Sequence, residues 1–214
     1  KERAKVRGVA VSYVPQSAAA AFNPAQRIMD QVIEITRIHE LMPRAQAEAK
    51  AVDLFRALSL PSPETIGGRY PHQVSGGQLQ RLSAAMALIG DPKVVIFDEP
   101  TTALDVTTQI EVLRAFKSVM RQSRMAGVYV SHDLAVVAQI ADRIVVLKGG
   151  VIQEIGATAQ ILSAPKHPYT QELLAAFAPP GRIPAQAASP EGSASRPVLE
   201  LSSISAGYGK LQAD

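Results

Sequence analysis

The 214-residue sequence contains no cysteine and no tryptophan, and only 5% of its residues are aromatic. The absence of cysteine excludes disulfides, a thiolate nucleophile, and zinc or iron–sulfur sites with Cys ligands from this chain. Polar or charged residues interrupt every apolar stretch, so no run approaches the ~18 residues of a membrane-spanning helix. Hydrophobic residues still make up 47% of the sequence, which is enough to build a core and excludes disorder as the main state.

An excess of charge of one sign is also missing. Lys and Arg number 22 and Asp and Glu 19, which leaves a net charge of +3. The pI of about 9.3 is high because few groups titrate between neutral pH and the Tyr and Lys range. It is weak support for a polyanion partner, and we expect no nucleic acid among the partners.

Helical and strand patterns divide the chain into two parts. Residues 8–14 are β-branched and predict a buried strand that Pro15 ends. Residues 27–60 carry apolar residues at helical spacing, with a break at Pro43. From Gly76 on, helical and strand patterns alternate, which is typical of βαβ units and a parallel sheet. The other predicted elements are a loop over 61–68, helices over 76–89, 106–122, 134–141, 158–162 and 169–177, and strands over 94–97, 128–130, 144–147 and 151–155, the last two joined as a hairpin at 148–150.

Two adjacent carboxylates, Asp98 and Glu99, follow the predicted strand 94–97. The carboxyl ends of parallel strands form the edge at which open α/β sheets bind ligands. An Asp at such a place commonly holds Mg²⁺, usually through water, and a neighbouring Glu can polarise an attacking water. Gln16 and His132 also follow predicted strands, so we expect them at the same edge. Taken singly, each of these residues is a weak signal, since a solvated acid or a structural His fits the pattern too.

A capped helix start precedes the apolar helix 76–89. Ser75 and Gln78 have the spacing of a capping box. Between them, Gly76 and Gly77 would let an anion approach exposed backbone N–H groups at the positive end of the helix dipole. Glycine inside a helix costs about 1 kcal/mol relative to alanine. This cost favours contact with a phosphate over a plain helix start.

The order of these motifs resembles that of the ATP-binding-cassette (ABC) ATPases over residues 1 to about 178. The correspondences are Gln16 with the Q-loop glutamine, Val74–Gln78 with the signature, Asp98 with the Walker B aspartate, Glu99 with the catalytic glutamate, Ala103–Asp105 with the D-loop and His132 with the switch histidine. The resemblance implies an α/β fold like that of the P-loop NTPases, with a parallel sheet and an inserted α-helical subdomain. Tyr70–His72 and His167–Thr170 resemble hallmarks of the dipeptide and oligopeptide importers.

The resemblance implies ATP hydrolysis that powers the import of peptides or a related small solute. Its implied catalytic residues are Glu99, His132 and Gln16, its nucleotide-binding residues Ser75, Gly76, Gly77, Gln78 and Asp105, and its Mg²⁺ ligands Asp98 and Gln16, partly through water. The implied cofactors are ATP and Mg²⁺. The implied partners are a second cassette, integral-membrane permease subunits that dock on the helical subdomain and, indirectly, a periplasmic or extracellular solute-binding protein. The expected location is peripheral, on the cytoplasmic side of the inner membrane.

No phosphate-binding loop of the form G-x-x-x-x-G-K-[ST] occurs in the sequence. In the family this loop precedes the Q-loop strand, so we expect the chain to begin after it and to be inactive alone. Residues 198–210 resemble the opening strand of a second cassette, with Tyr208 in the place of the aromatic that stacks on adenine. The chain is therefore expected to be an internal piece of a tandem two-cassette protein.

The expected domains follow from these assignments. They are residues 1–21 (Q-loop strand and start of the core), 22–90 (helical subdomain and signature helix), 91–156 (core with Walker B, D-loop and switch histidine), 157–178 (C-terminal extension), 179–197 (a linker rich in Pro, Ala and Ser) and 198–214 (start of the second cassette). Two alternatives remain open at this point: a soluble tandem cassette that acts on ribosomes or DNA, and a nucleotide-free regulatory module.

Overall fold

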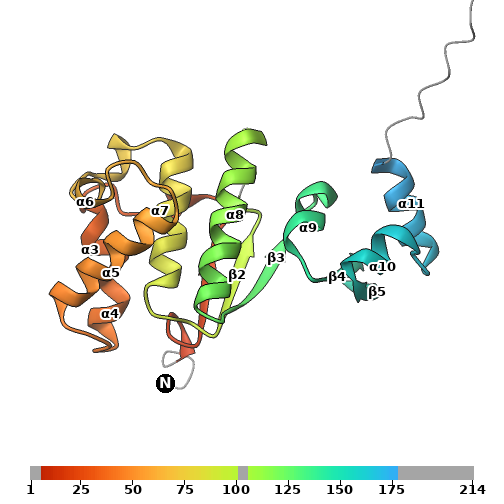
Figure 1. Cartoon of the computed structure of the whole chain (residues 1–214), viewed down its shortest axis with the longest axis horizontal. Coiled ribbons are helices and arrows are strands. Elements are labelled where there is room, and N and C mark those ends of the chain that lie inside the picture. Colours follow the sequence, from red (N-terminus) through yellow and green to blue (C-terminus); the bar gives the residue numbers. More distant parts are fainter. Residues whose placement is uncertain (1–5, 101–105, 178–214) are drawn as a thin grey trace, which may run out of the picture. The chain divides into compact units, whose positions relative to one another are not determined.

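A three-stranded parallel sheet brings three of the predicted strand ends to one edge (Figure 1). The structure, a computed structural model, describes residues 6–100 and 106–177. The strands are β1 (Val11–Val14), β2 (Val94–Asp98) and β3 (Ala126–Val130), in the order β1-β2-β3. The parallel α/β arrangement that the alternating patterns predict is therefore present in this part of the chain.

One face of this sheet carries the main core. Successive strand residues point to opposite faces, and Val14, Val95 and Phe97 lie almost fully buried on the same face. The helices α7 (Gly76–Leu88) and α8 (Val106–Gln122) contribute to the same cluster. Phe97 stacks on Phe116 of α8 with 5.0 Å between the ring centroids. The other face is more open, since Tyr13 is 54% exposed.

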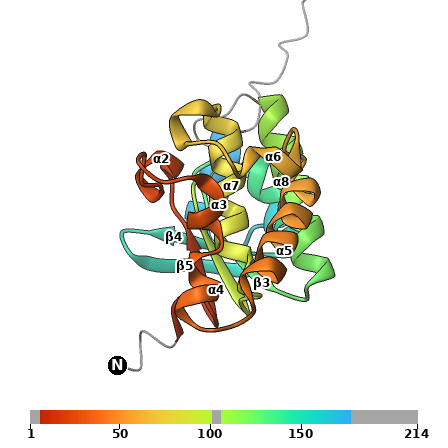
Figure 2. The same ribbon diagram turned by 90° about the vertical axis from the view of Figure 1, so that its left-hand side faces the viewer.

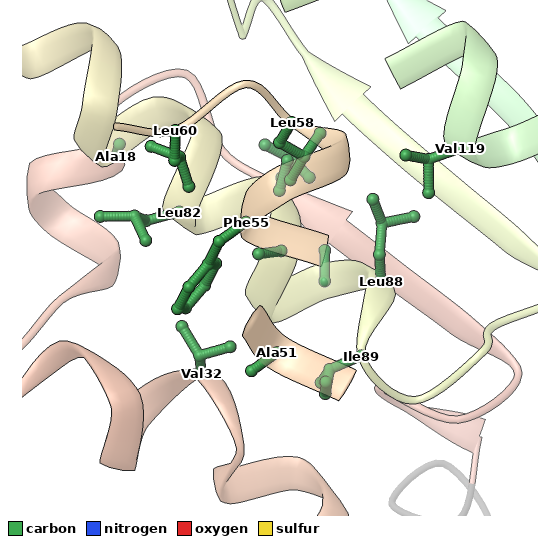
Figure 3. Close-up of a cluster of buried hydrophobic side chains, with 14 of the residues drawn as sticks. Ala18, Val32, Ala51, Phe55, Leu58, Leu60, Leu82, Leu88, Ile89 and Val119 are labelled. Carbon is green, nitrogen blue, oxygen red and sulfur yellow. The ribbon is translucent and has the colours of Figure 1, made fainter. Parts of the chain in front are cut away.

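A block of helices, residues 18–73, lies between β1 and α7 in the chain. Its members are α2 (Ala18–Ala21), α3 (Ile28–Val32), α4 (Glu34–Ile38), α5 (Arg44–Ala57), α6 (Pro63–Ile66) and the 3₁₀ turn η1 (Pro71–Gln73). Figure 2 shows this block gathered beside α7, which α2, α3 and α5 contact. The Phe55 ring is fully buried near Val32 and Leu82 (Figure 3). As predicted, the block contains no strand among its described residues.

A second, smaller core belongs to a β-hairpin. Strands β4 (Arg143–Lys148) and β5 (Val151–Ala157) pair antiparallel through a turn at Gly149 and Gly150, whose φ angles of +57° and +77° suit a tight hairpin. Ile144 and Val146 pack with Ile161 of α10 (Thr158–Ser163). The prediction of the hairpin is confirmed. The expectation that β4 extends the parallel sheet is wrong for the described residues, because β4 pairs with its neighbour in sequence.

A single carboxylate ties the last described helix to this hairpin. Glu154 on β5 is buried and accepts hydrogen bonds from the backbone N–H groups of Lys166 and His167, each at 3.0 Å, and from the Gln160 amide at 3.1 Å. These bonds, above all that from Lys166, lower the pKa of Glu154 to about 2. They hold the segment that leads into α11 (Pro168–Phe177).

Two other differences from the sequence-based prediction are local. Residues 8–10 form a turn instead of the start of β1, because Gly8 has a φ of +77°. The predicted loop 61–68 contains the short helix α6, which Pro63 begins after Ser62 in the left-handed conformation. None of the helices in the described ranges has the length and apolar character needed to span a bilayer.

Candidate functional site

The carboxyl ends of β1, β2 and β3 place the candidate site. Gln16 lies two residues after β1, Glu99 directly after β2, and His132 two residues after β3. Glu99 has a φ of +45°, which is uncommon for a residue with a side chain. Its backbone N–H donates to the Val130 carbonyl at 3.0 Å, which fixes this turn against β3. Strained backbone of this kind concentrates at functional sites.

The Glu99 carboxylate joins two of the other predicted site residues. Gln16 Nε2 donates to Oε2 at 3.0 Å, and His132 Nδ1 lies 2.8 Å from Oε1. The Glu99 side chain is 24% exposed, whereas that of His132 is 72% exposed. The structure therefore brings together three side chains that are far apart in sequence, with the imidazole facing solvent.

The hydrogen bond to Glu99 also shifts the pKa of the histidine. It raises the pKa of His132 above the ordinary value of 6.5, and the negative charges of Glu99 and Asp133 add to this effect. Asp133 itself caps α9 (Leu134–Ile140), since its carboxylate accepts from the N–H groups of Ala135 and Val136. His132 therefore lies directly before a capped helix start.

Asp98 lies at the same edge and has a partner that the sequence did not single out. Tyr13 Oη donates to Asp98 Oδ2 at 2.7 Å. The strand register explains the contact: Tyr13 pairs with Ile96, and Asp98 stands two residues further along β2 on the same face. The alternation of side chains would have indicated this contact once the pairing of β1 with β2 was known. The bond raises the pKa of the Tyr13 hydroxyl.

The predicted capping box at the start of α7 is confirmed. The backbone N–H of Gln78 donates to Ser75 Oγ at 3.3 Å, and that of Ser75 donates to Gln78 Oε1 at 3.0 Å. Apart from its chain neighbours and its own helix backbone, no described atom lies within 4 Å of the place where a Cβ on Gly76 would stand. Packing within the described chain therefore does not require glycine there, and the helix start is open to a ligand.

Another residue of α7 lies outside the predicted motifs. Gln80 is buried, and its amide donates to the Pro15 carbonyl at 3.3 Å. Because Pro15 directly precedes Gln16, this bond connects the helix that Ser75 caps with the segment that carries Gln16. A polar residue inside an apolar helix is the signal that could have revealed it.

The oxygen atoms at this edge fit Mg²⁺ in part. Asp98 offers a carboxylate, and Gln16 directs its Nε2 at Glu99, which leaves its carbonyl oxygen as a possible ligand. Within residues 6–100 and 106–177, no three His, Asp or Glu side chains form a group that could hold a metal alone. Hard cations accept carboxylate and carbonyl oxygens and complete their shell with water and phosphate. Asp105 and Tyr208, two further predicted nucleotide contacts, lie outside the described residues.

A parallel sheet with these polar strand ends, an inserted helical block and a capped glycine helix start defines an α/β domain like those of the P-loop NTPases. The ABC transporter family model matches residues 1–102. The probable D,D-dipeptide transport ATP-binding protein DdpD of Escherichia coli K12 is 41% identical over 186 residues, which are 87% of this chain and 56% of that protein. Over 87% of its length the chain is thus similar to an ABC transporter ATP-binding protein.

Other relatives agree with this assignment. The glutathione import ATP-binding protein GsiA of Escherichia coli K12 is 42% identical over 171 residues, which cover 80% of this chain and 27% of GsiA. A solved dimer of the ATP-binding cassette MJ0796, in a post-hydrolysis state with ADP and Pi, superposes with a TM-score of 0.65 at 25% identity and covers 73% of this chain and 66% of that one. The chain thus spans about half of DdpD and about a quarter of GsiA.

Proposed function

We propose that the chain is part of the ATP-hydrolysing subunit of an importer for peptides or a related small solute. The names of the two relatives, D,D-dipeptide transport and glutathione import, support this substrate class. The sequences Tyr70–His72 and His167–Thr170 support it independently. On this proposal, the subunit works on the cytoplasmic face of the inner membrane with permease subunits and, through them, with a solute-binding protein.

The observation that carries the hydrolytic part is the Glu99 carboxylate held between Gln16 and His132. A carboxylate fixed in this way can accept a proton from water and orient it for attack. His132 presents its second ring nitrogen to solvent and is a donor for phosphate oxygens when protonated. ATP supplies the phosphoryl group, and Mg²⁺ neutralises the charge of its phosphates. Asp98 and the Gln16 carbonyl are the proposed metal ligands, partly through water.

The start of α7 is the proposed contact to ATP bound by a second cassette. Ser75, Gly76, Gly77 and Gln78 form the first turn, whose N–H groups and dipole favour an anion. The dimeric arrangement of the structural neighbour supports a paired site. Asp105 and Tyr208 stay predicted nucleotide contacts.

The 214 residues contain no G-x-x-x-x-G-K-[ST] loop. Such a loop supplies the backbone N–H groups and the Lys that hold the β- and γ-phosphates. We therefore infer that this chain alone does not hydrolyse ATP. Measurable turnover by the purified 214-residue chain, or tight Mg²⁺-dependent nucleotide binding, contradicts this inference.

The helical block is the proposed contact to the permease. A groove of about 990 Å³ runs along α3 and α4 to the start of α5 and Tyr70. Its lining mixes apolar side chains such as Ile33 and Leu41 with charged ones such as Glu34. Of the two aromatic residues that we considered for this contact, Phe22 and Tyr70, Phe22 is only 5% exposed and belongs to the core. Tyr70 lines the groove and is the better candidate.

The test of the proposal is Glu99→Gln in the full-length protein. The amide keeps the size of the side chain but cannot accept a proton, so ATP binding should persist while hydrolysis is nearly abolished. Glu64→Gln, which changes an exposed side chain of α6, is the matched control and should hydrolyse ATP at the parent rate. Unchanged turnover of Glu99→Gln removes Glu99 from the base role. Co-purification with RNA instead of a membrane permease would reject the transport role.

A further inference from the structure

We propose that Tyr13 is a positioning residue for Asp98, whose carboxylate its hydroxyl orients toward the metal of the ATP site. The inference rests on the proposed function, because that function makes Asp98 a Mg²⁺ ligand. It adds a residue that lies outside the motifs from which the site was predicted. Tyr13 acts through Asp98 and touches neither ATP nor the metal.

The geometry assigns each carboxylate oxygen a separate task. Tyr13 Oη donates to Asp98 Oδ2 at 2.7 Å, a short bond to a charged acceptor. The two residues are 85 positions apart and meet because β1 and β2 are neighbours in the sheet. With Oδ2 held by the hydroxyl, rotation of the carboxylate about its last torsion is restricted. Oδ1 is then the oxygen that faces a cation or its bound water.

A purely structural role explains the contact less well. β1 and β2 are already paired over Val11–Val14 and Val94–Phe97. Tyr13 is 54% exposed and lies on the open face of the sheet, whereas the buried side chains of both strands are on the other face. An exposed hydrogen bond contributes little to folding. Its main effect is therefore on the orientation of Asp98.

Loss of such an outer partner weakens metal binding, typically about 10- to 100-fold. Tyr13 is exposed and the metal has further ligands from water and phosphate, so we expect a loss of about tenfold, at the low end of that range. Affinity for ATP without metal should not change, because on this proposal Tyr13 acts only through Asp98.

The experiment measures metal affinity directly. The full-length protein carrying Glu99→Gln is saturated with ATP, so that nucleotide is not consumed, and Mn²⁺ is titrated by electron paramagnetic resonance. Mn²⁺ takes the same oxygen ligands as Mg²⁺. Tyr13→Phe is compared with the parent and with Tyr169→Phe, which removes a hydroxyl from α11 and keeps the ring over Lys148. ATP affinity in EDTA and the thermal midpoint are measured on all three proteins.

We expect Tyr13→Phe to raise the Mn²⁺ dissociation constant about tenfold, with metal-free ATP affinity and thermal midpoint unchanged, and Tyr169→Phe to match the parent. Equal Mn²⁺ affinities of Tyr13→Phe and the parent overturn the inference and leave the proposed function standing. A parallel fall in metal-free ATP affinity or in the thermal midpoint also overturns it, because it indicates a structural role. A parent without ATP-dependent Mn²⁺ binding overturns the proposed function and this inference with it.

Discussion

At the scale of the residue, the pair of Glu99 and His132 makes a prediction about protonation. Glu99 raises the pKa of His132, so Glu99→Gln should return that pKa toward 6.5. The pair's stabilising contribution is complete below that ordinary value and is lost as pH rises through the raised pKa of the folded state. An NMR titration of the His132 ring in both proteins measures the difference. An unchanged pKa would show that the two side chains do not interact in solution.

A second residue-scale prediction concerns Glu154. Its pKa is lowered to about 2, first by the hydrogen bond from the Lys166 backbone N–H. The stabilising contribution of the carboxylate is therefore present above pH 4.5 and lost as pH falls from there toward 2. Glu154→Gln should unfold at lower denaturant concentration at pH 7 and lose less stability than the parent on acidification.

The matched control for this prediction is Glu172→Gln, which changes an exposed acid on α11. Urea denaturation at a series of pH values separates the two variants. Identical acid sensitivity of the parent and Glu154→Gln would mean that the hydrogen bonds from residues 166–167 to Glu154 do not contribute to folding.

At the scale of the element, α7 combines a stability cost with an open ligand site. A Cβ on Gly76 would meet no described atom within 4 Å besides its chain neighbours and its own helix backbone. Gly76→Ala should therefore stabilise the fold by up to about 1 kcal/mol through helix propensity, while it narrows the approach of phosphate and lowers ATPase activity in the full-length protein. Denaturation curves and turnover, measured on the same preparation, test both halves.

The control for Gly76→Ala is Gly150→Ala in the hairpin turn. Gly150 has a φ of +77°, so a side chain there is strained and the change should destabilise the fold without a direct effect on the ATP site. If Gly76→Ala gains stability and keeps full turnover, Gly76 only begins the helix and is not needed for contact with phosphate.

The elements themselves were largely predictable because their signals are local. The capping box at Ser75, the proline break before α5 and the paired glycines of the hairpin each act within a few residues. Because the carboxyl ends of parallel strands form one edge of a sheet, the sequence also predicted that Gln16, Glu99 and His132 share that edge. The contacts that were missed depend on which elements are neighbours. Tyr13 meets Asp98 because β1 pairs with β2, and Gln80 meets Pro15 because α7 contacts β1. Pairing partners across 65 or more residues leave no local signal.

At the scale of the whole molecule, exposed apolar side chains predict self-association of the 214-residue chain. Val128 and Val130 on β3 are 50% and 47% exposed, and Val145, Leu147 and Ile155 on the hairpin are similarly open. Exposed apolar strands are prone to pair with other chains. Sedimentation velocity should show oligomers that grow with concentration, and Val128→Lys with Val130→Lys should reduce them. A monodisperse parent that unfolds cooperatively contradicts this expectation.

The left-handed backbone at Glu99 favours some substitutions at this position over others. With a φ of +45°, the site tolerates Gly and Asn better than branched residues as far as the main chain is concerned. Neither supplies a carboxylate. In a saturation library, cellular abundance at position 99 should therefore rank Gly and Asn near the top, while a screen for growth on imported solute should reject both. The two rankings would diverge at this position far more than at the buried positions 95 and 97, where loss of packing lowers both together.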